Sequence, residues 1–303
     1  MPEAPPAPIQ AARGLAVLAE SPGEEHAMIA SSLGLESVPL VAEYSDLFLF
    51  QLYPYASVYL GPEGMIGGVA RDRIAGFWHA VGLRPPKEPD HLAALLGLYA
   101  SLIERAGAEG SEAEALLSVQ ASRTLLFEHL CPWVFSWLDR MQELSSGLYA
   151  SWANLLESFL LEELSGAGAS RFVDESVNSR AVSLQHLRNV PSLPDPRSDG
   201  SEAFIAGVLA SIRSGMIITR ADLAGIARSL DLGLRAGERR YALEHLIAQD
   251  AERTLRALMH EARRQGDAHQ HRVTWLGESA GHLSHRCAST AALLDELAQE
   301  GLS

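Results

Sequence analysis

Apolar side chains recur at intervals of three and four residues along most of this chain, and this spacing limits its fold more than any other feature. It is the period of an α-helix with one buried face. The strict alternation of a half-buried strand is scarce. We therefore predict an all-α fold, and 303 residues are enough to bury a core without disulfides or structural metals.

The expected helices fall into two groups along the chain. The clearest is predicted over residues 147–164, and others over 66–81, 91–105 and 112–130, with a further helix opened by Pro132, since proline is tolerated in a first turn. After Phe204 the helical period resumes across residues 220–231, 238–249, 251–264 and 279–299. Between the groups, residues 165–200 are rich in Ser, Pro and Asp and have no sustained period.

These patterns predict four regions. We expect a flexible N-terminal segment over 1–35, a helical bundle domain over 36–165, a linker over 166–199, and a C-terminal helical unit over 200–303. A helical protein with a long linker can exchange elements with a second copy, so a monomer and a homodimer are both left open.

The charge and the cysteines limit the function classes. A net charge of −14 repels nucleic acid and anionic lipid, so we expect neither as a partner. Cys131 and Cys287 form no paired framework, which favours a reducing compartment. We find no stretch of ~20 apolar residues, and the proline-rich start does not resemble a secretory signal. We expect a cytoplasmic protein without a membrane span.

Residues 43–64 form the first candidate binding segment. A helix through Tyr44 and Phe48 is expected to break at Pro54 into a loop that carries Tyr55 and Tyr59. Exposed tyrosines offer apolar area and a hydroxyl group, which suits peptide recognition. The alternative, favoured by composition, is that these rings pack onto the core.

Residues 84–96 form the second segment. Pro89 fits a first helical turn, and Asp90 lies where a carboxylate can accept from free backbone N–H groups. His91 has no such structural explanation, because helix caps do not require histidine. In the third segment, His129, Trp133 and Trp137 share one helical face, which indicates either core packing or a peptide groove.

These three segments, in this order, resemble the TorD/DmsD/NarJ family of molybdoenzyme maturation chaperones. The hallmark E-x-P-D-H-like segment is matched by Glu88, Pro89, Asp90 and His91. Of the following F-x-x-H-L-x-x-W pattern, only His129, Leu130 and Trp133 are carried over, because Phe127 stands two places before His129 rather than three.

The resemblance covers about the middle half of the chain and implies a TorD-like helical bundle without catalysis. Residues 200–303 form a C-terminal extension beyond it, and we expect no cofactor. The implied partner is the precursor of a molybdenum-cofactor oxidoreductase subunit, bound through its twin-arginine signal peptide or as the apoprotein. Asp90 would pair with an arginine of this client, and His91 would orient that contact. The weaker candidates for peptide binding are Glu88, Pro89, Tyr44, Phe48, Pro54, Tyr55, Tyr59, His129 and Trp133.

Two other functions compete with this one. Residues 219–247 have the helix, turn and helix of a helix-turn-helix DNA-binding regulator, but residues 213–240 hold six arginines against three acidic residues, a weak basic surface. Thr219 as a helix cap with Asp222 at its third position explains that start without DNA. A histidine-rich, metal-dependent enzyme is the less favoured alternative, because no zinc-binding spacing accompanies His260, His269, His271, His282, His285 and Cys287.

Overall fold

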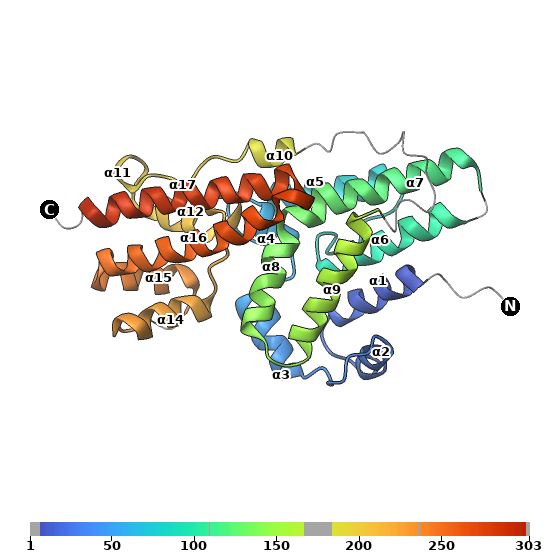
Figure 1. The fold of residues 1–303 in the computed structure, drawn as a ribbon, viewed down its shortest axis with the longest axis horizontal. Coiled ribbons are helices and arrows are strands. Elements are labelled where there is room, and N and C mark those ends of the chain that lie inside the picture. Colours follow the sequence, from blue (N-terminus) through green and yellow to red (C-terminus); the bar gives the residue numbers. More distant parts are fainter. Residues whose placement is uncertain (1–6, 109, 167–183, 236, 301–303) are drawn as a thin grey trace. The chain divides into compact units, whose positions relative to one another are not determined.

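The computed structural model describes residues 7–108, 110–166, 184–235 and 237–300 (Figure 1). Within these ranges the regular structure is helical and contains no strand, which confirms the all-α prediction. The chain forms two compact units, which we describe separately. Unit 1 comprises residues 1–56 and 69–183, and unit 2 comprises residues 57–68 and 184–303.

Unit 1 is a bundle whose longer helices match the expected positions within a few residues. Its elements are α1 (Ala7–Leu18), α2 (His26–Ser32), α3 (Val41–Tyr44), η1 (Ser45–Gln51), α5 (Gly68–Ala80), α6 (Leu92–Gly107), α7 (Glu112–Thr124), η2 (Leu125–Leu130), α8 (Cys131–Leu144) and α9 (Leu148–Leu164). Helix α1 packs against α6 and α9, and α8 packs against α9.

An aromatic cluster forms the centre of the unit 1 core. The Phe48 ring lies 5.7 Å from the Trp137 ring and 4.9 Å from the Tyr149 ring, both in edge-on geometry. Trp152 lies 6.0 Å from Trp137. Such pairs contribute about 0.5–1.5 kcal/mol each beyond their buried area. The aromatic residues of α8, α9 and η1 therefore stabilise the bundle.

Two π-helical segments, η1 and η2, are features that the spacing of apolar residues did not predict. The second directly precedes α8, where Pro132 occupies the first turn as expected. A single extra residue per turn rotates the side chains that follow. In η2 it separates the register of α7 from that of α8, so that the expected helix over 112–130 ends as an α-helix at Thr124.

Residues 7–32 differ from the flexible segment expected over 1–35. Helix α1 buries Ile9, Ala12, Leu15 and Leu18, and the Trp152 indole nitrogen donates to the Leu15 carbonyl oxygen at 3.2 Å. The helical period of α1 gives this segment an apolar face that packs on α6.

Unit 2 is built around the long antiparallel hairpin of α16 (Ala251–Leu276) and α17 (Glu278–Glu300), which lie side by side in Figure 1. The other elements are α4 (Ala56–Leu60), α10 (Gln185–Arg188), α11 (Pro196–Asp199), α12 (Ser201–Leu209), α13 (Ser211–Ser214), α14 (Arg220–Leu230) and α15 (Arg239–Gln249). Gly215 has φ of +81°, and a Cβ atom there would lie 2.5 Å from the Cys287 backbone nitrogen. Glycine at this position therefore lets the end of α13 approach α17 closely.

Residues 57–68 belong to unit 2 although both flanking segments belong to unit 1. The Ser211 hydroxyl donates to the Tyr59 carbonyl oxygen at 3.2 Å, and the Gly67 backbone N–H donates to Ser57 Oγ at 3.0 Å. The chain thus leaves unit 1 after Ala56, contributes α4 to unit 2, and returns at Val69.

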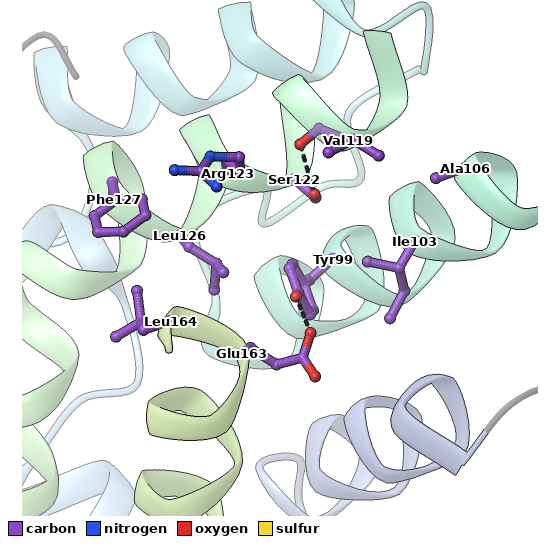
Figure 2. A pocket seen from close by; sticks show the side chains of 10 residues that line it. All are labelled: Tyr99, Ile103, Ala106, Val119, Ser122, Arg123, Leu126, Phe127, Glu163 and Leu164. Carbon is purple, nitrogen blue, oxygen red and sulfur yellow. Dashed lines mark hydrogen bonds between the residues drawn. The ribbon is translucent and has the colours of Figure 1, made fainter. Parts of the chain in front are cut away.

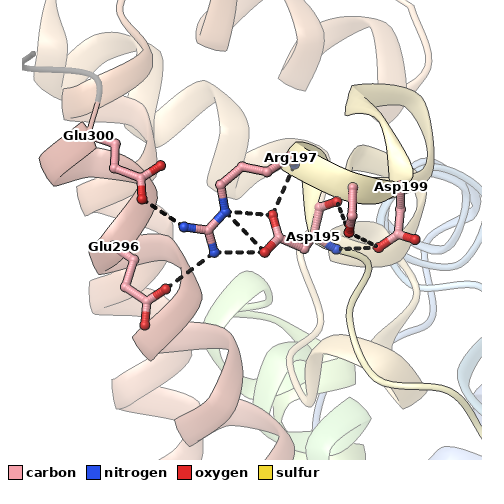
Figure 3. A network of polar contacts seen from close by, with 6 residues as sticks. Asp195, Arg197, Asp199, Glu296 and Glu300 are labelled. Atoms are coloured by element: carbon pink, nitrogen blue, oxygen red, sulfur yellow. Dashed lines mark hydrogen bonds and ion pairs between the residues drawn. The ribbon is translucent and has the colours of Figure 1, made fainter.

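Part of the expected linker, residues 167–183, lies outside the described residues. The described remainder carries α10 and α11, which pack into unit 2. Figure 3 shows Arg197 of α11 between Asp195 and two carboxylates of α17, with distances of 2.6 Å to Asp195, 3.3 Å to Glu296 and 2.7 Å to Glu300. These ion pairs fix residues 195–199 against the last turns of α17.

Among the described residues, we find no helix that combines the length and the apolar character needed to cross a bilayer.

Candidate functional site

Two of the predicted segments meet through a short antiparallel backbone bridge in unit 1. The Ala56 N–H donates to the Asp90 carbonyl oxygen at 2.9 Å, and the Leu92 N–H donates to the Pro54 carbonyl oxygen at 2.7 Å. This pairing places Tyr55 opposite His91, and their rings meet edge-on at 4.9 Å. The aromatic segment and the E-x-P-D-H-like segment therefore form one site.

His91 is the N-cap of helix α6. Its Nδ1 atom accepts from the Ala93 backbone N–H at 3.1 Å, and its backbone is extended, as in other N-caps. The expectation that Asp90 occupies this position, and that His91 has no structural role, is wrong. Because Nδ1 accepts, a neutral His91 ring carries its proton on Nε2.

The site opens into a solvent-exposed pocket of about 580 Å³, which we call the acidic pocket. Helix α6 supplies a floor of small side chains, Ala93, Ala94, Gly97 and Ser101. Its walls are the aromatic and charged side chains of Tyr44, Tyr55, Trp78, Glu20, Glu88 and Lys87, with Ser21, Pro86 and His91. It thus combines two carboxylates with three aromatic rings.

The two carboxylates change the titration of the nearby tyrosines. Burial and then the charge of Glu88, to which Tyr55 is hydrogen-bonded, raise the pKa of Tyr55 to about 12. Burial, followed by Glu20 and Glu88, also raises the pKa of Tyr44. The pocket therefore has a negative potential that favours cations.

Burial has the larger effect on His91. It lowers the pKa of His91, although the carboxylates of Glu88, Glu20 and Asp90 act in the opposite direction. The His91 imidazole is therefore neutral near pH 7. The capping role requires this, because Nδ1 can accept a hydrogen bond only when it carries no proton.

The loop that carries Glu88 is fixed to helix α5. The Trp78 indole nitrogen donates to the Pro89 carbonyl oxygen at 3.2 Å, and the Arg71 guanidinium donates to the Lys87 carbonyl oxygen at 3.1 Å. The prolines of this loop restrict the same backbone. Glu88 is therefore exposed on a backbone that is held on both sides.

Asp90 occupies a different environment. It is 1% exposed and does not line the acidic pocket, and neighbouring Pro89 is also buried. In this conformation an arginine that enters the pocket meets Glu88 and Glu20 rather than Asp90.

The other candidates are distributed between the core and the second unit. Phe48 is fully buried in the aromatic cluster, and Pro54 is a buried part of the backbone bridge. Trp133 and His129 are also buried, and the Trp133 indole nitrogen donates to the His129 carbonyl oxygen at 2.8 Å. Tyr59 is buried in unit 2. The expectation of an exposed aromatic loop is therefore correct only in part, for the half-buried Tyr53 and Tyr55.

Glu20, Ser21, Trp78 and Lys87 line the acidic pocket but were not predicted. Glu20 and Ser21 follow α1 within the segment that we expected to be flexible. The apolar stripe of α1 was the signal that could have placed them near a core. Trp78 lies in the helix predicted over 66–81, and nothing in the sequence connected that helix with a site.

A second cavity in unit 1 is too small for a peptide side chain. Figure 2 shows its lining, with the Tyr99 hydroxyl bonded to the buried carboxylate of Glu163. Its volume is about 30 Å³, which is near the space of one water molecule. This cavity is a packing feature between α6, α7 and α9.

The described residues offer no cluster of three or more His, Cys, Asp or Glu side chains that could bind a metal ion. Cys287 is fully buried, and burial raises the pKa of its thiol to about 12. His269 contacts the Gly215 carbonyl oxygen at 2.9 Å inside unit 2.

The helices of the alternative DNA-binding segment are α14 and α15. Thr219 caps α14 and Asp222 completes the capping box, as predicted. Arg240 forms ion pairs with Glu202 at 2.7 Å and Glu244 at 2.9 Å, and Arg239 donates to the Ile218 carbonyl oxygen. These arginines make contacts within unit 2, which further weakens the case for a basic DNA-binding surface.

The acidic pocket lies almost entirely in a part of the chain that matches a known family. Residues 22–139 match the family described as nitrate reductase delta subunit. Over these residues the predicted resemblance to the TorD/DmsD/NarJ group is confirmed. The match includes Tyr44, Tyr55, Glu88 and His91, whereas residues 184–303 lie outside it.

Two individual proteins are also similar to this chain. Two proteins named chaperone protein TorD, from two strains of Vibrio cholerae serotype O1, are each 30% identical to this chain over 133 residues. The similarity covers 41% of this chain, and the chain spans 60% of the length of these curated relatives. No solved structure matches the chain significantly.

Proposed function

We propose that this chain is a non-enzymatic chaperone that binds the precursor of a molybdenum-cofactor oxidoreductase subunit before its export. The TorD relatives and the family match support the chaperone class. The observation that carries the finer proposal is the acidic pocket, which places Glu20 and Glu88 beside three aromatic rings.

A twin-arginine signal peptide joins two guanidinium groups to an apolar stretch. A guanidinium forms paired, charge-assisted hydrogen bonds with a carboxylate and stacks on aromatic faces. Glu88 and Glu20 would accept from the arginines, while Tyr55 and Trp78 would cover their planes. The small side chains of α6 leave room for the stem of an arginine side chain.

Capture is reversible in this mechanism, and no bond is made or broken. Release of the peptide after cofactor insertion would allow export, so the chaperone would delay transport rather than catalyse a step. His91 fixes the start of α6 and the ring of Tyr55, and it acts as a positioning residue.

The first test is binding of a fluorescent twin-arginine peptide, measured by anisotropy. Glu88→Gln removes one charge-assisted contact, which is worth about 1.5 kcal/mol at an exposed site and corresponds to about tenfold weaker binding. Glu162→Gln makes the same change at an exposed position of α9 outside the pocket and is expected to leave binding unchanged. Equal affinity of both variants would show that the pocket does not bind the arginines.

The second test identifies the client. A pull-down from native extract, with bound proteins identified by mass spectrometry, is expected to recover a molybdoenzyme precursor with its signal peptide intact. Loss of that precursor in the Glu88→Gln pull-down would connect the client to the acidic pocket. Recovery of DNA instead would favour the helix-turn-helix alternative.

A further inference from the structure

A second pocket, in unit 2, has the opposite charge. We call it the basic pocket; its volume is about 480 Å³ and it is open to solvent. Its basic side chains come from Arg188 of α10, Arg213 of α13, and His282, His285 and Arg286 of α17. This concentration of cations is unusual in a chain with a net charge of −14.

Within the part of the chain that the structure describes, a carboxylate neutralises only one of the three arginines. Arg188 forms a two-pronged contact with Glu278, with both distances at 2.6 Å. Arg286 donates instead to the Val190 carbonyl oxygen and to His282 Nε2, the latter at 3.3 Å. No carboxylate of the described residues pairs with Arg213, and its buried Nε atom has no hydrogen-bond acceptor.

The cations of the basic pocket repel one another. Burial lowers the pKa of Arg286, and the neighbouring Arg213 lowers it further. Burial, followed by Arg286 and His285, lowers the pKa of His282 to about 4. Arg188 acts in the same direction on His282, and Glu278 acts in the opposite one. The basic pocket therefore holds two guanidinium groups that no carboxylate of the described residues neutralises, beside a neutral imidazole.

We propose that the basic pocket binds the phosphate group of a small organic phosphate between Arg213 and Arg286. Guanidinium groups match the geometry of a phosphate oxygen pair, and a dianion removes the repulsion between them. The exposed Ser289 hydroxyl, one turn beyond Arg286, is a further donor.

The size and the apolar lining favour an organic phosphate over the free ion. Pockets for small organic ligands fall in a range of about 300–1,000 Å³, which includes this one. Leu193 and Leu293 line the same pocket and offer apolar contact to the organic part. The site lies outside the matched residues 22–139 and does not depend on the proposed peptide binding.

Calorimetric titration of the full chain with phenyl phosphate and with inorganic phosphate tests the proposal. We expect phenyl phosphate to bind more tightly than inorganic phosphate, and Arg213→Gln to weaken binding by about tenfold or more. Arg253→Gln makes the same charge change outside the pocket and is expected to change the affinity less than about twofold, since screened surface charges have small effects. Inorganic phosphate that binds as tightly as phenyl phosphate supports the site with the free ion as its source.

A second variant tests the same pocket in case Arg213→Gln does not fold. Ser289→Asp places a carboxylate at an exposed position of the same pocket and is expected to abolish phosphate binding while the far-ultraviolet circular dichroism stays unchanged. Binding that is equal in the parent, Arg213→Gln and Ser289→Asp overturns the proposal. The proposal is also overturned if the basic pocket binds a glutamate-rich peptide but binds neither phenyl phosphate nor inorganic phosphate.

Discussion

The acidic pocket of unit 1 and the basic pocket of unit 2 are similar in volume but opposite in charge. Each contains a histidine with a lowered pKa, yet the causes differ. Carboxylates surround His91, and burial outweighs them. Cations surround His282, and they act in the same direction as burial. A lowered histidine pKa therefore does not reveal the sign of the charge that a pocket attracts.

The largest effect is expected when the charge of the acidic pocket is reversed. Glu20→Lys with Glu88→Lys removes two charge-assisted contacts, each worth about 1.5 kcal/mol, so we expect at least about a hundredfold loss of twin-arginine peptide affinity. Anisotropy titration measures this loss. The matched control is Glu36→Lys with Glu162→Lys, two exposed positions outside the pocket. Phosphate binding in unit 2 should persist in both double variants.

Phosphate should separate the two histidines by nuclear magnetic resonance. Phenyl phosphate places a negative charge beside His282, and such a charge raises a histidine pKa by roughly 1–3 units. The pKa of His91 should stay unchanged in the same titration. A shift of both histidines, or of neither, would contradict a site confined to the basic pocket.

Capping by His91 can be separated from binding with two substitutions. His91→Ala removes the acceptor for the Ala93 N–H, which costs about 1 kcal/mol and lowers the melting temperature by roughly 2–4 °C. His91→Asn supplies another good N-cap and should restore most of this stability. A peptide affinity that falls in both variants would indicate that the imidazole itself contacts the client.

The pH dependence of stability tests the environment of His282 directly. His282 has a folded pKa of about 4 and an ordinary value of 6.5, so the unfolded chain binds its proton first as the pH falls. Stability should therefore decrease from about pH 6.5 toward pH 4, and a saturating phosphate should reduce the decrease. Thermal melts of the parent and His282→Gln measure it; an identical pH profile for the two would exclude this contribution.

The sequence predicted the helices whose apolar stripes are long and uninterrupted. Helices α6, α8 and α9 lie at the positions that the spacing of apolar residues predicted. Thr219 caps α14, as the Asp222 three residues later indicated. These features depend on residues within a few positions of one another, which a single sequence displays directly.

The acidic pocket could not be predicted from the sequence, because it is formed by contacts between residues far apart in the chain. The backbone bridge brings Tyr55 to His91, and the fold of α1 brings Glu20 to the same pocket. Asp90 was expected to pair with an arginine of the client, but tertiary packing buries Asp90, whereas Glu88 is exposed. The family resemblance pointed to the segment over residues 88–91, whereas the structure was needed to see which of its carboxylates is accessible.

The path of α4 has a consequence for synthesis on the ribosome. Residues 57–68 emerge early, but their partners in unit 2, such as Ser211, are translated more than one hundred residues later. During that interval residues 57–68 lack the rest of their own unit, although Val58, Tyr59 and Leu60 are buried in the finished protein. Unit 2 therefore completes its folding only after translation of the C-terminal hairpin, and a chain that is cut within 167–183 leaves the C-terminal fragment without residues 57–68 of its own unit.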